Sequence, residues 1–263
     1  MEVFGYVASV VIGFVLGLLG GGGSILSIPI LVYLFHIDAV TASAYSLFIV
    51  GTTSFAGAIP KYKDHLVNIK TGFLFGIPSI VAIFITRRWI VPSIPDILYQ
   101  SESFIFTKRL LLLGIFALLM ILASVSMIRG RKENKMVRGS MRIPLTIIEG
   151  ILIGFLTGLV GAGGGFLIIP ALIFLTRLPM KAASGTSLFI IGINSLIGFA
   201  GDLFIMSMDW AFLLKVTALA IVGVHFGNVL SKRVSNRQLR VGFGWFTLAM
   251  GCFILAREIF FTT

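Results

Sequence analysis

Long apolar stretches separated by short polar turns dominate the chain. Residues 110–128 contain 19 positions without a charged side chain, and residues 143–160 contain only Glu149. Stretches of this length are typical of helices that cross a lipid bilayer. The pattern predicts an all-α membrane protein with helices at about residues 3–19, 24–35, 42–59, 66–86, 108–128, 143–161, 165–176, 183–204, 210–230 and 238–257.

The same pattern occurs twice along the chain. Residues 13–57 align without a gap to residues 154–198, and 21 of these 45 positions are identical at an offset of 141. Weak internal symmetry with glycine-interrupted apolar segments is typical of secondary transporters. We therefore predict two repeats of about five helices each, at residues 1–128 and 143–263, separated by a linker at 129–142.

Basic side chains indicate the orientation of these repeats. Lysine and arginine are enriched in cytoplasmic loops, and the linker is the most basic segment, with Arg129, Arg131, Lys132, Lys135, Arg138 and Arg142. Counting spans outward from a cytoplasmic linker puts matching loops of the two repeats on opposite sides, so the repeats are predicted to be inverted, with both termini outside. One external segment, residues 87–109, is itself basic; we interpret it as a loop inserted in the first repeat.

Composition excludes several classes of protein. The chain is 57% hydrophobic and 12% charged with a mean hydropathy of +1.06, whereas a soluble domain carries about 25% charged residues. The net charge of +11 is therefore explained by topology, and no nucleic-acid partner is expected. The single cysteine, Cys252, cannot form an internal disulfide and is expected in the core. The plasma membrane of a prokaryote is the expected location.

The glycine runs are the strongest candidates for a binding site. They leave backbone groups without partners, which is tolerated at membrane depth only inside protein or along a watery cavity. The short segment after each run is a half-helix or a strongly tilted helix whose N-terminus favours an anion. Hydroxyls on the next helix of each repeat add neutral donors. The candidate substrate-binding residues are Gly20, Gly21, Gly22, Gly23, Ser24, Ser43, Ser46, Gly161, Gly163, Gly164, Gly165, Ser184, Thr186, Ser187 and Asn194.

Three further residues are candidates for coupling to a driving ion, either a proton or sodium. His225 and Asn228 lie near the predicted inner end of a span, and Arg87 is opposite Asn228 in the other repeat. Ionisable groups inside a membrane are functional candidates by default, although near the interface they also extend to water. Small residues such as Gly13 and Gly17 also have an ordinary interpretation as helix-packing positions.

Other functions remain open alternatives. An anion channel uses half-helix ends in the same way as a carrier. A membrane-embedded enzyme is less favoured, because the three histidines are at different predicted depths and form no metal cluster. A soluble dinucleotide enzyme would need a strand and a helix around the glycines, which the flanking apolar runs oppose. No cofactor and no metal are expected, and the predicted partners are a small anion, a coupling ion and the lipid bilayer.

The paired glycine motifs resemble those of the sulfite exporter TauE/SafE family, also called toluene sulfonate uptake permeases or the domain of unknown function 81 group. The resemblance rests on residues 17–24 followed by Pro29, on residues 158–165 followed by Pro170, and on the serine-containing segments 42–47 and 182–187. It covers essentially the whole chain, apart from Ser24 at a common glycine position and the insertion at 87–109. It implies transport of small sulfur-containing or carboxylate anions, such as sulfite, sulfonates or sulfoacetate, coupled to an ion gradient.

Overall fold

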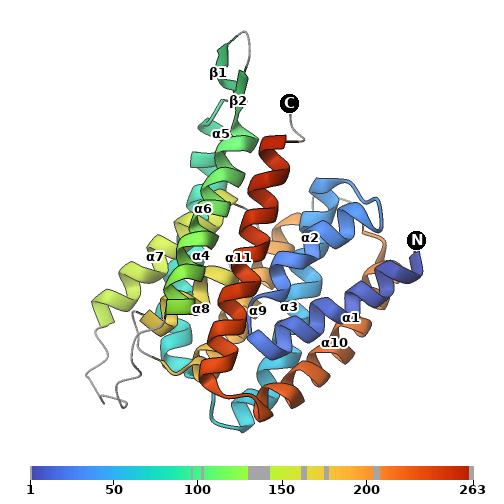
Figure 1. Ribbon diagram of the computed structural model, residues 1–263, viewed down its shortest axis with the longest axis vertical. Helices are drawn as coiled ribbons and strands as arrows, with labels where there is room; N and C mark the ends of the chain where they lie inside the picture. The colour runs from blue at the N-terminus through green and yellow to red at the C-terminus, as the bar shows by residue number, and fades with distance from the viewer. Residues whose placement is uncertain are drawn as a thin grey trace.

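The computed structural model describes residues 2–95, 97–101, 104–129, 143–160, 165–174, 178–203 and 208–260. These residues form a helical bundle with one two-stranded β-hairpin (Figure 1). The main helices are α1 (Glu2–Leu19), α2 (Gly23–Tyr33), α3 (Ala39–Lys63), α4 (Ile69–Ile85), α6 (Lys108–Arg129), α7 (Ile143–Val160), α8 (Gly165–Phe174), α9 (Met180–Asp202), α10 (Trp210–Arg233) and α11 (Asn236–Phe260).

Six helices are long and apolar enough to cross a membrane, namely α3, α4 with the turn that follows it, α6, α9, α10 and α11. α2 and α8 are much shorter, with 11 and 10 residues. Large apolar side chains cover the outside of the bundle, for example Phe73 and Phe84 on α4 and Phe226 on α10. Such a surface suits lipid rather than water, so the chain is an integral membrane protein. Cys252 is on this outer surface, and its predicted place in the core is wrong.

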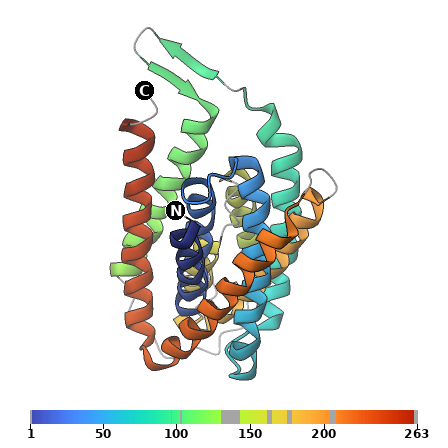
Figure 2. The ribbon, with the colours of Figure 1, turned by 90° about the vertical axis from the view of Figure 1, so that its right-hand side faces the viewer.

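The inserted segment is more ordered than the predicted loop. α4 continues through a π-helical turn, η1 (Thr86–Ile90), into the short α5 (Val91–Ser93). An antiparallel hairpin of β1 (Ile97–Ser101) and β2 (Phe104–Thr107) then leads into α6. The insertion is therefore an extension that stands at one end of the bundle (Figure 2). Sequence reasoning missed it because its prolines were interpreted only as breakers.

Helices from the two halves of the chain pack in a reciprocal pattern. α3 packs on α9, α6 on α11 and α2 on α8, while α1 packs on α10 and α7 on α4. Gly13 lies so close to the backbone of Ala220 that a Cβ would collide with it, and a Cβ on Gly154 would likewise collide with the backbone of Ser79. Gly13 and Gly154 are 141 positions apart (154 − 13), and so are Ser79 and Ala220 (220 − 79). Equivalent glycines thus meet equivalent positions on the partner helix.

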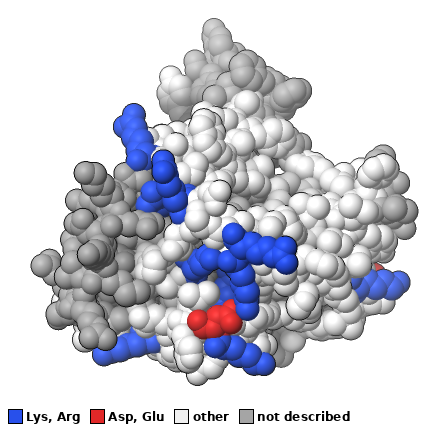
Figure 3. Space-filling model, turned by 60° about the horizontal axis from the view of Figure 1, so that its bottom comes forward, with Lys and Arg blue, Asp and Glu red and all other residues white. Residues whose placement is uncertain are grey.

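The end of the molecule opposite the hairpin is basic. The α3–α4 turn, the α10–α11 turn and the end of α6 gather there (Figures 1 and 2), and lysine and arginine outnumber acidic side chains in the view of Figure 3. At this end the Lys232 ammonium pairs with the Asp64 carboxylate at 2.6 Å. We call it the basic end and the hairpin side the opposite end.

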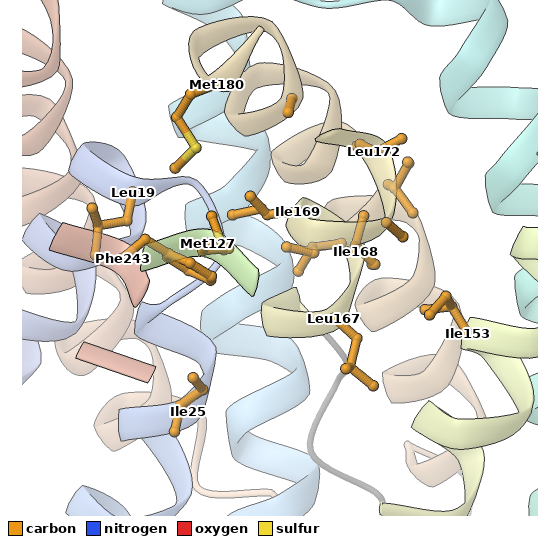
Figure 4. Close-up of a cluster of buried hydrophobic side chains, with 14 of the residues drawn as sticks. Leu19, Ile25, Met127, Ile153, Leu167, Ile168, Ile169, Leu172, Met180 and Phe243 are labelled. Carbon is orange, nitrogen blue, oxygen red and sulfur yellow. The ribbon is translucent and has the colours of Figure 1, made fainter. Parts of the chain in front are cut away.

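α8 is enclosed by protein. Its side chains from Leu167 to Leu172 are buried, and Met127 of α6 and Phe243 of α11 lie in the same apolar cluster (Figure 4). An apolar half-helix can lie this deep because neighbouring helices separate its ends from lipid. The centre of the bundle is therefore shaped by short helices rather than by complete spans.

Candidate functional site

The first glycine run ends α1 in a left-handed turn. Gly20 has φ +89°, and its N–H donates the last hydrogen bond of α1 to the Leu16 carbonyl at 2.7 Å. Glycine adopts this conformation without the steric cost that a side chain would add. α2 begins at Gly23, and within the described residues the N–H groups of Gly21 and Gly22 have no hydrogen-bond acceptor. The break therefore offers two buried donors at the start of α2.

α9 of the other half packs directly on this break. The Ser187 hydroxyl lies 2.8 Å from the Gly20 carbonyl and 2.9 Å from the Ser184 carbonyl, within donor distance of both. A side chain on Gly20 would collide with Ser184. Ser184 and Ser187, two of the predicted site residues, therefore lie beside the first glycine run.

The start of α8 meets the same break. A Cβ on Gly21 would lie 2.5 Å from the Gly165 carbonyl oxygen, and a Cβ on Gly165 would lie 2.7 Å from the Ser24 hydroxyl. The beginnings of the two short helices therefore touch each other. The predicted site residues Gly161, Gly163 and Gly164 lie outside the described residues.

A buried lysine completes this arrangement. Lys61, in the last turn of α3, is 4% exposed, and its ammonium donates to the Ser184 hydroxyl at 2.7 Å. In the part of the chain that the structure describes, no carboxylate lies within ion-pair distance of Lys61. Sequence reasoning placed Lys61 among the basic loop residues and missed it. Its spacing of seven from Ser54 was the available signal, since it puts both on one helical face.

Asn228 of α10 contacts α3 at Gly57, one helical turn before Lys61. Its amide nitrogen donates to the Gly57 carbonyl at 3.1 Å, which leaves its buried carbonyl oxygen without a partner in the described structure. Gly57 precedes Lys61 by four residues on α3. Lys61, Ser184, Ser187, Asn228 and the backbone of residues 20–22 are called the break cluster below.

Other predicted site residues lie elsewhere. Ser43 is 18 residues from Lys61 (61 − 43), about 27 Å along α3, and Ser46 shares a hydrogen bond of 2.5 Å with Ser27 of α2. Asn194 donates weakly to Ser79 of α4 at 3.4 Å. Thr186 accepts the Asn68 N–H at 3.0 Å and so holds the α3–α4 turn. These side chains do not join the break cluster.

The coupling candidates differ from one another. His225 is exposed on the outer face of α10 beside Phe226, so its side chain points away from the bundle interior. Arg87 lies in η1, near the opposite end from Lys61, and its side chain is outside what the structure describes. Only Asn228 of the three lies at the break cluster.

Two central serines have buried hydroxyls without partners. Ser54 of α3 and Ser195 of α9 occupy equivalent repeat positions and are 0% and 1% exposed. No hydrogen bond to either hydroxyl is formed by the described residues. Ser54 shares a helical face with Lys61, and Ser195 shares one with Ser184, 11 residues before it. A polar strip thus continues from the break cluster toward the bundle centre.

A cavity of about 360 Å³ opens where α1 and α10 begin. Tyr6, His36, Tyr45, Asp209 and Phe212 are among its lining residues. The Tyr45 hydroxyl accepts the Asp209 N–H at 2.7 Å, and the Phe35 ring packs edge-on against Phe212. This cavity therefore ends in an aromatic layer, remote from the basic end.

Comparisons with known proteins relate the chain to membrane transporters. Residues 6–254 match the family described as sulfite exporter TauE/SafE. A "Probable membrane transporter protein" of Xylella fastidiosa is 30% identical over 94% of this chain and 92% of its own length. The "Probable membrane transporter protein YunE" of Bacillus subtilis is 26% identical over 97% and 99%. A similarly named protein of Methanocaldococcus jannaschii is 27% identical over 94% of each chain.

Proposed function

The chain belongs to the sulfite exporter TauE/SafE family of membrane transporters, and from this premise we propose that it is a secondary transporter of small sulfur oxyanions, such as sulfite or a sulfonate. The proposed binding site is the break cluster. Its proposed location is a prokaryotic plasma membrane, as suits relatives from bacteria and an archaeon. No catalytic role is proposed.

The observation that carries this proposal is the buried Lys61 ammonium at the first glycine break. A buried cation is costly unless a counter-charge or several acceptors surround it. Among the described residues, the Ser184 hydroxyl is the one acceptor of the Lys61 ammonium. A bound anion would supply the missing counter-charge. The N–H groups of Gly21 and Gly22, for which the described residues provide no acceptor, favour the same charge, and so does the N-terminal end of α2.

The mixture of one charge and several neutral donors suits a carrier rather than a permanent binding site. Lys61 attracts the anion, and the Ser184 hydroxyl, which accepts from Lys61, can donate its own proton to an oxygen of the anion. The Ser187 hydroxyl donates to backbone carbonyls and so holds α9 against the break. Hydrogen bonds to a charged group are worth about 1.5–3 kcal/mol each, so a few of them hold an anion without preventing its release. Sulfite and sulfonates carry three oxygens on one sulfur atom, and each oxygen can accept from a different donor of the break cluster.

We also propose that the two repeats are inverted. The reciprocal packing of α1 on α10 and of α7 on α4 supports a twofold relation, because these helix pairs exchange under the repeat offset. The contact between Ser24 and Gly165, which are equivalent positions (165 − 24 = 141), supports the same axis. Rocking of one repeat against the other would then open the centre to each side in turn.

A thermal-shift screen of the purified protein against sulfite, sulfonates, sulfate and acetate tests the function. A ligand that binds only the folded state raises the apparent stability by RT ln(1 + [L]/Kd), so the sulfur oxyanions should raise the melting temperature in proportion to log concentration. A carrier will also show counterflow in proteoliposomes, where unlabelled sulfonate inside accelerates entry of labelled sulfonate. A channel would give flux without counterflow, and no shift with any anion would reject the proposal.

A further inference from the structure

A buried carboxyl group on α7 is not part of the proposed anion site. Glu149 is 4% exposed, and both of its carboxylate oxygens are without a hydrogen-bond partner in the described structure. It is in the second turn of a helix that is otherwise uncharged from Ile143 to Val160. Ionisable side chains inside membrane segments mark ion and proton pathways.

The described helices that pack on α7 carry few charged side chains near Glu149. α4 packs on α7 at Gly150 through the Phe75 backbone, and α4 has no titratable side chain between Thr71 and Ile85. α8 has none, and those of α6 and η1 lie at Lys108, Arg109 and Arg129, and at Arg87 and Arg88. Lys70, at the start of α4, is exposed. Arg177, which follows α8, lies outside the described residues.

We propose that Glu149 carries the proton that drives transport, so that the protein is a proton–anion symporter; this rests on the proposed function. A carboxylate without partners is unstable in a dry site, and the described conformation therefore holds Glu149 in its neutral, protonated form. Loss of the proton requires a conformation in which water or a cation reaches the carboxylate. Protonation and conformation are linked in this way, which is the requirement for coupling.

The charges on Lys61, Glu149 and the anion favour symport over antiport. A carrier loaded with anion and proton contains Lys61 positive, the anion negative and Glu149 neutral. In the empty carrier Lys61 is positive and Glu149 is negative, so the charges of Lys61, Glu149 and the anion sum to zero in both forms. In antiport the anion would cross with a charged Glu149 and the proton would cross with an uncompensated Lys61. Each of those forms places net charge in the membrane, which is costly.

The test uses the purified full chain in proteoliposomes and a radiolabelled sulfonate, because a sulfonate keeps its charge as the pH changes. Uptake is measured with and without an inward proton gradient, and exchange is measured at equal pH on both sides. The unaltered protein should take up sulfonate faster with the gradient. Glu149→Gln should lose this acceleration while exchange continues. Thr157 is another buried side chain of α7, and its hydroxyl has no partner among the described residues; Thr157→Val should keep both the acceleration and the exchange.

Acceleration that persists in Glu149→Gln would overturn the proposal, and so would an unaltered protein that exchanges sulfonate without any response to the gradient. An unaltered protein that exchanges sulfonate without responding to the gradient would support anion transport and reject only the proton coupling. Absence of all exchange would reject both the transport and the coupling. If Glu149→Gln does not fold, infrared spectra of the unaltered protein decide. A protonated carboxylic C=O band at neutral pH supports the proposal, and its absence contradicts it.

Discussion

The Lys61 ammonium donates a hydrogen bond to the Ser184 hydroxyl at 2.7 Å and thereby joins the end of α3 to the beginning of α9. The two residues come from different halves of the chain, and Ser184 in turn packs against Gly20. One contact thus connects a charge, a hydroxyl and a helix break that are far apart in sequence.

Removal of the Ser184 hydroxyl should expose the cost of the buried ammonium. Ser184→Ala leaves Lys61 without its acceptor, and we expect a loss of about 1–3 kcal/mol in the free energy of unfolding. In a Lys61→Met background the same change should cost much less, because no ammonium is left unpaired. A double-mutant cycle of unfolding in detergent measures the difference. Additive effects would show that the contact contributes nothing of its own.

The turn at Gly20 should tolerate no side chain. Gly20→Ala meets both a left-handed backbone and the Ser184 side chain, so a loss of about 1–3 kcal/mol is expected. Gly242→Ala in α11 is the matched control, since nothing lies within 4 Å of its added Cβ and alanine favours a helix by up to about 1 kcal/mol. Equal melting temperatures for the two variants would contradict the geometry.

The helical bundle was predictable, whereas the charged part of the site was not. Uncharged runs of membrane length predict helices, because in lipid the backbone N–H and C=O groups must bond to each other and a helix satisfies them all. The glycine runs likewise predict breaks, and Ser184 and Ser187 do lie at one. Lys61 was missed because a lysine at the end of a predicted span is normally interpreted as a loop residue. Its burial comes from tertiary packing, which the sequence does not show. Ser43 and Ser46 lie on the same helix as Lys61 but far from its end, and Ser46 bonds with Ser27 of α2, a contact that only the packing of α2 on α3 determines.

The central hydroxyls of Ser54 and Ser195 should matter for transport more than for stability. Neither forms a hydrogen bond in the described structure, so Ser54→Ala and Ser195→Ala lose none. If the anion passes between α3 and α9, each change should slow sulfonate exchange by roughly 10-fold, the value of one hydrogen bond to a charge. Ser9→Ala, which removes a bond to the Gly5 carbonyl, should lower stability slightly and leave exchange unchanged. Equal exchange rates in all three variants would place the path elsewhere.

Orientation in the membrane can be tested by labelling. The basic end should face the cytoplasm, because lysine and arginine are retained there. With Cys252 replaced by serine, a cysteine at Ser140 should be protected from an impermeant reagent added outside, whereas a cysteine at Thr263 should react. The reverse labelling pattern would invert every loop assignment.

Calorimetric titration of sulfite or a sulfonate into two lysine variants tests the central claim most directly. Lys61→Met removes the buried charge and keeps the side-chain volume, a replacement that folded proteins commonly tolerate. Lys63→Met removes an exposed charge two residues away in the same helix turn. The account predicts that Lys61→Met weakens binding by about 10- to 150-fold and that Lys63→Met binds as the unaltered protein does. Unchanged affinity in a folded Lys61→Met variant would contradict it.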